Sequence, residues 1–383
     1  MPKLRQARRL DLAQGRRHQE MQLRTVRNSA QEDALTPVSP PFALSRRSFA
    51  LGASAAALAA CDNSARGAIV NVYSARHYEA DRALYDAFEQ ASGIAVRVLP
   101  ASAEQLLERL RAEGEASEAD LVVAADAGNL WRMQDAGLLQ SGTSAALERN
   151  VPSHLRDAQN HWWGFTKRAR IIIYRTGALD PAQVASMDDL AHPRLRGQVV
   201  ARSSTNTYNL SLLAARIERL GADSARMWAA GVRANFARDA QGSDTDQIKA
   251  VAAGEAQATI ANHYYYLRMM ESEDPTERDA AGKVALVFPD QAGAGAHINI
   301  SGAGIAAHAK RPAEAMQLLE YLVSDAGQHV LAPLNNEFPI RPAISPAPAL
   351  TALGPFKEEV VPLDALGRHQ SEAARIFEEV GWR

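Results

Sequence analysis

The strongest constraint on the fold is an alternation of short apolar runs and amphipathic stretches that begins at Ala68. Residues 81–92 and 102–113 have the apolar spacing of helices, and Gly93 and Gly114 stand where these helices would end. Around them lie three predicted strands, AIVNVYS, IAVRVLP and ADLVVA. This order predicts a parallel, doubly wound sheet whose ligands bind beyond the carboxyl ends of its strands.

The same rhythm restarts at Trp163, which predicts a second lobe of the same kind. WGFTKRARIIIYR and GQVVARS are expected to contain strands, and 209–220 is an expected helix. Residues 245–266 are expected to form a helix, a glycine turn and a strand that delivers three tyrosines. A chain of 383 residues that is 46% hydrophobic can bury the cores of two such domains. We therefore predict an α/β protein of two lobes.

The charges are unevenly distributed, although the net charge of −2 is small. Residues 1–61 contain 10 of the 42 Lys and Arg residues but only 4 of the 44 Asp and Glu residues. The remainder is therefore acidic and has no long basic stripe. This distribution argues against nucleic acid as the main partner.

An export signal is predicted ahead of the first strand. Arg46 and Arg47, within SRRSF, precede 12 apolar or small residues, and Leu-Ala-Ala-Cys61 closes the run. Such a run is too short for a permanent membrane span, which needs about 20 residues, but it fits the core of a signal peptide. The pattern resembles a twin-arginine signal joined to a lipobox, whose cysteine becomes the lipidated N-terminus of a lipoprotein in the periplasm.

Cys61 is the only cysteine, so an internal disulfide or a cysteine-based zinc site is excluded. We expect residues 1–61 to comprise a disordered extension followed by this signal, and residues 62–67 to be a linker. The alternative is a buried Ala-rich helix with an incidental cysteine. The order of basic flank, short apolar core and cysteine favours the signal.

Phenols and an imidazole occur in the loops that border the predicted strands. SARHY follows the first strand, and SSTNTYN and NHYYY lie in the second lobe, so that these loops offer His77, Tyr78, Tyr208, Tyr264 and Tyr265. A phenol has an ordinary pKa of about 10, so a phenolate at neutral pH needs a strongly charged cation beside it. Phenolate oxygen is a hard donor and suits a hard cation such as Fe³⁺. Each residue alone would be ordinary core or loop, but together they indicate a metal site.

Motifs of other function classes do not occur in the sequence. There is no phosphate-binding Gly-Lys-Ser/Thr loop, no GxGxxG after a strand and no GxSxG elbow. No paired Cys or Met accompanies the histidine, which disfavours a soft metal. A metal-dependent enzyme would need an open coordination position and a general base, and no motif assigns one. We predict that the protein is not an enzyme.

The chain resembles the periplasmic ferric-ion-binding proteins of ABC transporters, in the branch typified by the FutA and FbpA proteins. The resemblance covers nearly all of 68–383 and is carried by VYSARHY, DAGNLWRMQDAGLLQ, HWWGFTKRARIIIY, SSTNTYN and ANHYYYLR. It implies a two-lobed, type II periplasmic-binding-protein fold with a hinge, each lobe a doubly wound, mainly parallel sheet. Lobe 1 would comprise 68–165 and 295–345, and lobe 2 would comprise 166–294 and 346–383. The implied function is delivery of Fe³⁺ by a monomer to an inner-membrane ABC permease.

The resemblance also implies which residues hold the ion. His77 and Tyr78 would come from lobe 1, and Tyr208, Tyr264 and Tyr265 from lobe 2. Four phenolates around Fe³⁺ leave one net negative charge, which is costly to bury unless a cation lies nearby. Three arginines beside the ligand loops are candidates for that role: Arg76, Arg202 and Arg268.

Two further details follow from the resemblance. Tyr266 would be a packing residue, and carbonate is the candidate synergistic anion. A related branch has a glutamate ligand where this chain has Ala124-Ala125-Asp126. That departure favours a tyrosine-rich site in which the anion is optional, and it argues against a role for Asp126.

Another small solute is the alternative within the same architecture. A polyamine, sulfate or thiamine site would need carboxylates or an anion-binding nest with scattered aromatic residues. Phenols in three separate loops favour ferric iron instead.

Overall fold

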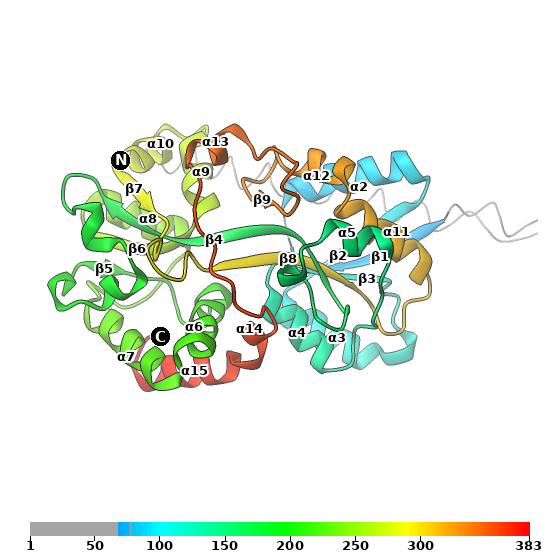
Figure 1. The fold of residues 1–383 in the computed structure, drawn as a ribbon, viewed down its shortest axis with the longest axis horizontal. Helices are drawn as coiled ribbons and strands as arrows, with labels where there is room; N and C mark the ends of the chain where they lie inside the picture. The colour runs from blue at the N-terminus through cyan, green and yellow to red at the C-terminus, as the bar shows by residue number, and fades with distance from the viewer. Residues whose placement is uncertain (1–67, 77) are drawn as a thin grey trace, which may run out of the picture. The chain divides into compact units, whose positions relative to one another are not determined.

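The structure is a computed structural model that describes residues 68–76 and 78–383 (Figure 1). The predicted signal, Cys61, the linker and His77 lie outside the described residues. Within the described ranges, no helix is both long enough and apolar enough to cross a membrane.

The strands join in the order β2-β1-β3-β8-β4-β6-β5, and β7 and β9 both pair with β4. Their bounds are β1 (Ile69–Ser74), β2 (Ala95–Pro100), β3 (Leu121–Ala124), β4 (Trp163–Arg175), β5 (Val199–Val200), β6 (Ala258–Asn262), β7 (Val284–Val287), β8 (Ile298–Ile305) and β9 (Phe338–Pro339). The pairs β1–β2, β1–β3 and β5–β6 are parallel. The pairs that β4 and β8 make are antiparallel.

Strand β4 connects two groups of elements, because different halves of it have different partners. Residues 163–169 pair with β8 and β9, whereas residues 170–175 pair with β6 and β7. Figure 1 shows β4 and β8 running through the middle of the molecule, with helices gathered at either side. The predicted lobe boundary between residues 165 and 166 falls inside β4, and the division into lobes stays a prediction.

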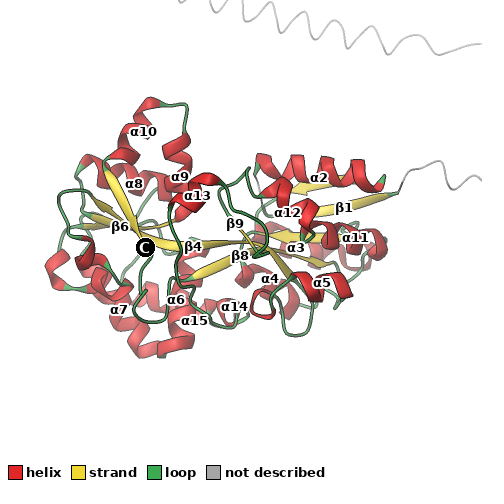
Figure 2. Ribbon diagram, turned by 45° about the horizontal axis from the view of Figure 1, so that its top comes forward, coloured by secondary structure: helices red, strands yellow, loops and turns green. Residues whose placement is uncertain are grey.

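Helices cover the strands on both sides of each group (Figure 2). Their bounds are α2 (Glu79–Ser92), α3 (Ala103–Glu113), α4 (Ala127–Asp135), α5 (Ala145–Asn150), α6 (Thr207–Leu220), α7 (Ala222–Ala234), α8 (Asp244–Ala253), α9 (His263–Glu271), α10 (Pro275–Gly282), α11 (Pro312–Leu322), α12 (Asp325–Leu331), α13 (Pro348–Ala352), α14 (Ala365–Arg368) and α15 (Gln370–Glu379). In the group around β1–β3, α2 and α12 lie opposite α3 and α4 (Figures 1 and 2).

The helix ends follow the sequence signals. Ser102 and Gln105 form a complete capping box at the start of α3. Gly93 ends α2 with a φ of 73°, a left-handed conformation that favours glycine. The predicted helices at 81–92 and 209–220 are therefore found, each beginning two residues earlier than expected.

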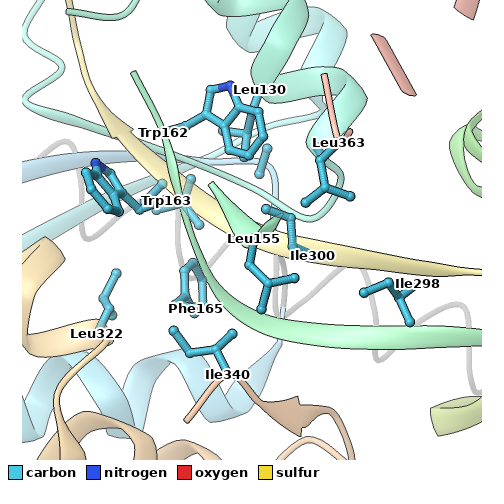
Figure 3. Packing of buried hydrophobic residues seen from close by; sticks show 14 of the residues in the cluster. Leu130, Leu155, Trp162, Trp163, Phe165, Ile298, Ile300, Leu322, Ile340 and Leu363 are labelled. Carbon is cyan, nitrogen blue, oxygen red and sulfur yellow. The ribbon is translucent and has the colours of Figure 1, made fainter. Parts of the chain in front are cut away.

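The largest buried side chains lie around the start of β4. Figure 3 shows Trp162, Trp163 and Phe165 packed with Leu155 and Ile300, and each of these five is at most 2% exposed. Because β4 is covered on both faces, its residues are buried almost without interruption. This core fixes the strand from which two arginines reach the candidate site.

Candidate functional site

Tyr78 and Tyr208 lie at the starts of two helices. Tyr78 ends the loop that follows β1 and is the N-cap residue of α2. Tyr208 is the second residue of α6, and its backbone N–H donates to the side chain of the cap residue Asn206 at 3.0 Å. The two helix starts therefore set the directions of both phenols.

Tyr264 and Tyr265 lie in the first turn of α9, which begins at His263 directly after β6. Tyr264 is fully buried and Tyr265 is partly buried. Tyr266 packs against a separate apolar cluster of Leu267 and Leu350. The sequence predicted that a bent strand presents the tyrosines. Instead, β6 ends at Asn262 and the tyrosines lie in the helix α9 that follows it directly.

The four phenols meet at one place. The hydroxyl of Tyr264 donates to that of Tyr208 at 3.2 Å. The ring centroids of Tyr264 and Tyr265 are 4.5 Å apart, and Tyr78 meets Tyr264 edge-on at 6.2 Å. Three segments far apart in the sequence therefore bring their phenols together.

Two buried arginines of β4, Arg168 and Arg170, lie next to the phenols. Neither was among the candidate residues chosen from the sequence. Arg168 is 1% exposed, and its Cζ lies 5.1 Å from the centroid of the Tyr208 ring. Its Nε and Nη1 have no hydrogen-bond partner among the described residues, and Nη2 donates to the Ala125 carbonyl. Arg170 pairs with Asp244 at 2.9 Å. Side chains alternate along a strand, so residues 168 and 170 lie on one face. Two arginines at this spacing in an otherwise apolar strand are the feature of the sequence that could have indicated their role.

The three arginines chosen from the sequence also border the phenols. Arg76 and Arg268 have their Cζ atoms 4.3 and 4.8 Å from the Tyr78 ring centroid. Arg268 is equally close, at 4.8 Å, to the ring of Tyr264. Arg202 lies 5.8 Å from the Tyr208 ring and pairs with Asp244 at 3.2 Å. The phenols are therefore surrounded by guanidinium groups.

The charge on Arg76 is already matched by acidic partners. Its guanidinium pairs with Asp81 at 2.8 Å and with Glu337 at 2.7 Å. Glu337 is fully buried, and Arg76 holds the pKa of this carboxyl below its ordinary value against the effect of burial. Arg168, in contrast, has one carboxylate within 4 Å among the described residues, that of Asp126 at 3.8 Å. Arg168 is therefore better able than Arg76 to balance negative charge on the phenols.

Asp126 is occupied by structural hydrogen bonds. It is fully buried and caps α4, where it accepts from the backbone N–H of Gly128 at 2.8 Å. It also accepts from Asn299 at 2.8 Å and from the hydroxyl of Ser211 at 2.9 Å. These contacts join α4 to β8 and α6.

Burial raises the pKa of all four phenols above the ordinary value, and that of Tyr264 well above it. Glu337 raises the pKa of Tyr78 further, whereas Arg76 and Arg168 lower it. Without a bound cation, the phenols are therefore protonated at neutral pH. A strongly charged ion would have to displace these protons to gain anionic ligands.

Two hollows border the phenols. A cavity of about 310 Å³ is lined by Tyr208 and Thr207 together with Ala75, Ala125 and Arg132. A larger hollow of about 710 Å³ is lined by Tyr78 and neighbouring residues of α2 and β2. Open space therefore lies next to Tyr78 and next to Tyr208.

Comparison with known proteins identifies the family. The model of the bacterial extracellular solute-binding proteins matches residues 83–357. Iron uptake protein A2 of Synechocystis sp. is 42% identical over 347 residues, which are 89% of this chain and 99% of that protein.

Solved structures agree with this match. FutA of Trichodesmium, in complex with iron and citrate, is 41% identical with a TM-score of 0.80, covering 82% of this chain and all of that chain (100%). The ferric binding protein of Campylobacter jejuni is 37% identical with a TM-score of 0.78, again over 82% and 100% of the two chains. The resemblance seen in the sequence and the type II fold are thereby confirmed. The chain belongs to the bacterial extracellular solute-binding protein family.

Proposed function

We propose that this protein binds Fe³⁺ and delivers it to an ABC permease for iron uptake. The observation that carries the proposal is the meeting of four phenols from three segments at one buried place. Phenolate oxygen is a hard, anionic donor that suits a hard trivalent cation. Similar proteins support the same function, since one is named for iron uptake and another was solved with iron and citrate.

The proposed ligands are Tyr78, Tyr208, Tyr264 and Tyr265 with His77, which lies outside the described residues. Four phenolates leave the ferric complex with one net negative charge. Arg168 supports this ligand set, because it is a buried cation 5.1 Å from the Tyr208 ring with two N–H groups free of partners among the described residues. Arg202 and Arg268 add positive charge at the edge of the site.

A small anion such as carbonate is proposed to complete the coordination from the cavity beside Tyr208. This cavity adjoins the N-terminus of α6, where backbone N–H groups favour negative charge. The hydroxyl of Thr207 lines the cavity and is buried with no partner in the described part of the chain. Arg132 lines the same cavity, where it pairs with Glu104 at 3.6 Å.

Iron binding is expected to colour the protein and to release protons. Because the phenols are protonated in the free protein, binding should release about four protons per ion, and affinity should fall as the pH falls. Adding Fe³⁺ in a weak buffer measures both effects, through the phenolate-to-iron charge-transfer band and the drop in pH. A colourless protein, or binding without proton release, would contradict phenolate ligation.

The protein is proposed to act in the periplasm as a monomer, anchored by a lipid on Cys61 after export by the twin-arginine route. The support is the pattern of Arg46, Arg47, a short apolar run and the cysteine. A diacylated cysteine gives a stable anchor, which a single chain does not. The membrane also places the protein beside its permease.

Fractionation tests the anchor. The wild type should sediment with membranes, resist salt extraction and dissolve in detergent, whereas Cys61→Ser should lack lipid. Arg46→Lys combined with Arg47→Lys should block export, because that route reads the arginine pair. Wild-type protein found in the cytoplasm with Cys61 unmodified would refute the localisation and leave the metal site unaffected.

A further inference from the structure

The segment Asn335–Glu337 contains a fully buried carboxylate. Glu337 is 1% exposed, and its Oε2 accepts from Arg76 Nη1 at 2.7 Å and from the Thr166 hydroxyl at 2.6 Å. Asn335 donates to the same oxygen at 3.0 Å. A buried charge is retained at low cost only when it is paired and hydrogen-bonded. Here three donors bond Oε2, whereas Oε1 has no partner among the described residues.

Through Arg76, this carboxylate reaches the loop that bears Tyr78. The Arg76 side chain is fully buried, and it precedes Tyr78 by two residues. Its Cζ lies 4.3 Å from the centre of the Tyr78 ring, so the guanidinium plane supports the phenol directly. The same guanidinium donates to Asp81 and to the Ser301 hydroxyl. The position of Tyr78 therefore depends on a side chain that Glu337 holds.

The other side of the segment reaches the helix that bears Tyr264 and Tyr265. His263, the first residue of α9, donates from Nε2 to the carbonyl of Asn336 at 2.8 Å. Asn336 Nδ2 donates to Glu271, the last residue of α9, at 2.8 Å. Both ends of this helix are thus attached to one residue.

Asn336 has a φ of 55°, a left-handed conformation that asparagine tolerates but that costs free energy. Such a conformation persists when surrounding contacts determine it, and the contacts here are those of Asn336 to α9 and of Glu337 to Arg76. A segment of three residues consequently touches two of the three parts of the chain that present phenols.

We propose that Asn335–Glu337 couples the placement of Tyr78 to that of Tyr264 and Tyr265, with Glu337 as the positioning residue. This inference rests on the proposed ferric-ion site. Glu337 acts through Arg76 and is not itself an iron ligand. Partners of this kind, one step removed from a metal, orient its ligands and influence affinity.

Glu337→Gln is the decisive variant. Loss of the charge loosens Arg76, so Fe³⁺ affinity should fall by about tenfold to a hundredfold. The charge-transfer band should also shift, because a displaced Tyr78 changes the ligand field of the iron. In a cycle with Tyr78→Phe, the double variant should bind Fe³⁺ within about twofold of Tyr78→Phe alone, since the effect of Glu337 passes through Tyr78.

Asp81→Asn is the matched control. It removes the other carboxylate from the same guanidinium, but Asp81 lies on α2 and makes no hydrogen bond to Asn335–Glu337. Its effect on affinity should be clearly smaller than that of Glu337→Gln. An equal effect would mean that only the charge on Arg76 matters, which overturns the coupling.

Glu337→Asp extends the test if Glu337→Gln does not fold. It keeps the charge and shortens the side chain, so an intermediate loss with the same non-additivity is expected. A coloured, iron-binding wild type with additive or absent effects of both Glu337 variants would overturn this inference and leave the proposed function standing. A wild type that binds no Fe³⁺ would overturn both.

Discussion

Replacing Tyr264 or Tyr265 with phenylalanine is expected to lower Fe³⁺ affinity by at least about tenfold in each case. Each change removes one anionic oxygen and keeps the ring, so the packing between the two rings at 4.5 Å is retained. The apo protein should change little, because the hydrogen bonds of the Tyr264 hydroxyl within the described residues are those with Tyr208 and Asn262, each worth about 1 kcal/mol. Calorimetric or competition titration with Fe³⁺, together with apo melting temperatures, measures both quantities.

Tyr266→Phe is the internal control for this result. Tyr266 packs against the apolar cluster of Leu267 and Leu350, and it is absent from the aromatic pairs that join Tyr264 to Tyr78 and Tyr265 in the described residues, so this variant should bind Fe³⁺ like the wild type. Equal losses in all three variants would show that the run of tyrosines acts through packing. Such a result would refute the separate roles given to Tyr264 and Tyr266.

The fold was predictable because its elements carry local signals. The capping box at Ser102 and the left-handed glycine at Gly93 mark helix ends through contacts within a few residues. The parallel β1–β2 and β1–β3 pairs follow from the strand–helix alternation. The loops proposed to carry the metal ligands were chosen in the same way, because they border the predicted strands.

The features that were missed depend on contacts between distant residues. The chain passes directly from β6 into α9 at His263, although tyrosines favour strands. The start of α9 is fixed instead by the bond of His263 to Asn336, a residue 73 positions away in the sequence. No local pattern announces such a contact. Helix placement at the tyrosines therefore required the tertiary structure.

The buried arginines show the same limit. Arg168 and Arg170 look like surface charges in a strand, yet they are 1% and 2% exposed. Their burial depends on elements from distant parts of the chain that cover the faces of β4, where Arg168 meets Ala125 and Asp126 and Arg170 meets Asp244. The sequence suggested that a cation offsets the phenolates, but it pointed to loop arginines, of which Arg76 is already paired with two carboxylates.

Arg168→Met is expected to lower Fe³⁺ affinity by about a hundredfold. Two unit charges about 5 Å apart attract by roughly 3 kcal/mol at an effective dielectric constant of about 20, which corresponds to that factor in binding. The attraction is absent while the phenols are neutral, so it acts on the loaded protein only. The apo protein should also lose some stability, because the variant leaves Asp126 buried without the cation 3.8 Å away and removes the donor to the Ala125 carbonyl.

Arg168→Lys and Arg216→Met complete this experiment. Lysine keeps the charge and should recover much of the lost affinity, although it cannot reproduce the planar guanidinium. Arg216 is also buried, at 3% exposure, and lies eight residues after Tyr208 on α6, where its Cζ is 4.4 Å from the Trp228 ring. Its replacement should leave Fe³⁺ affinity within about twofold of the wild type, as expected for an independent site. Equal affinity losses for Arg168→Met and Arg216→Met would mean that removing any buried arginine disturbs the protein, and Arg168 would then have no special part in balancing the charge of the ferric complex.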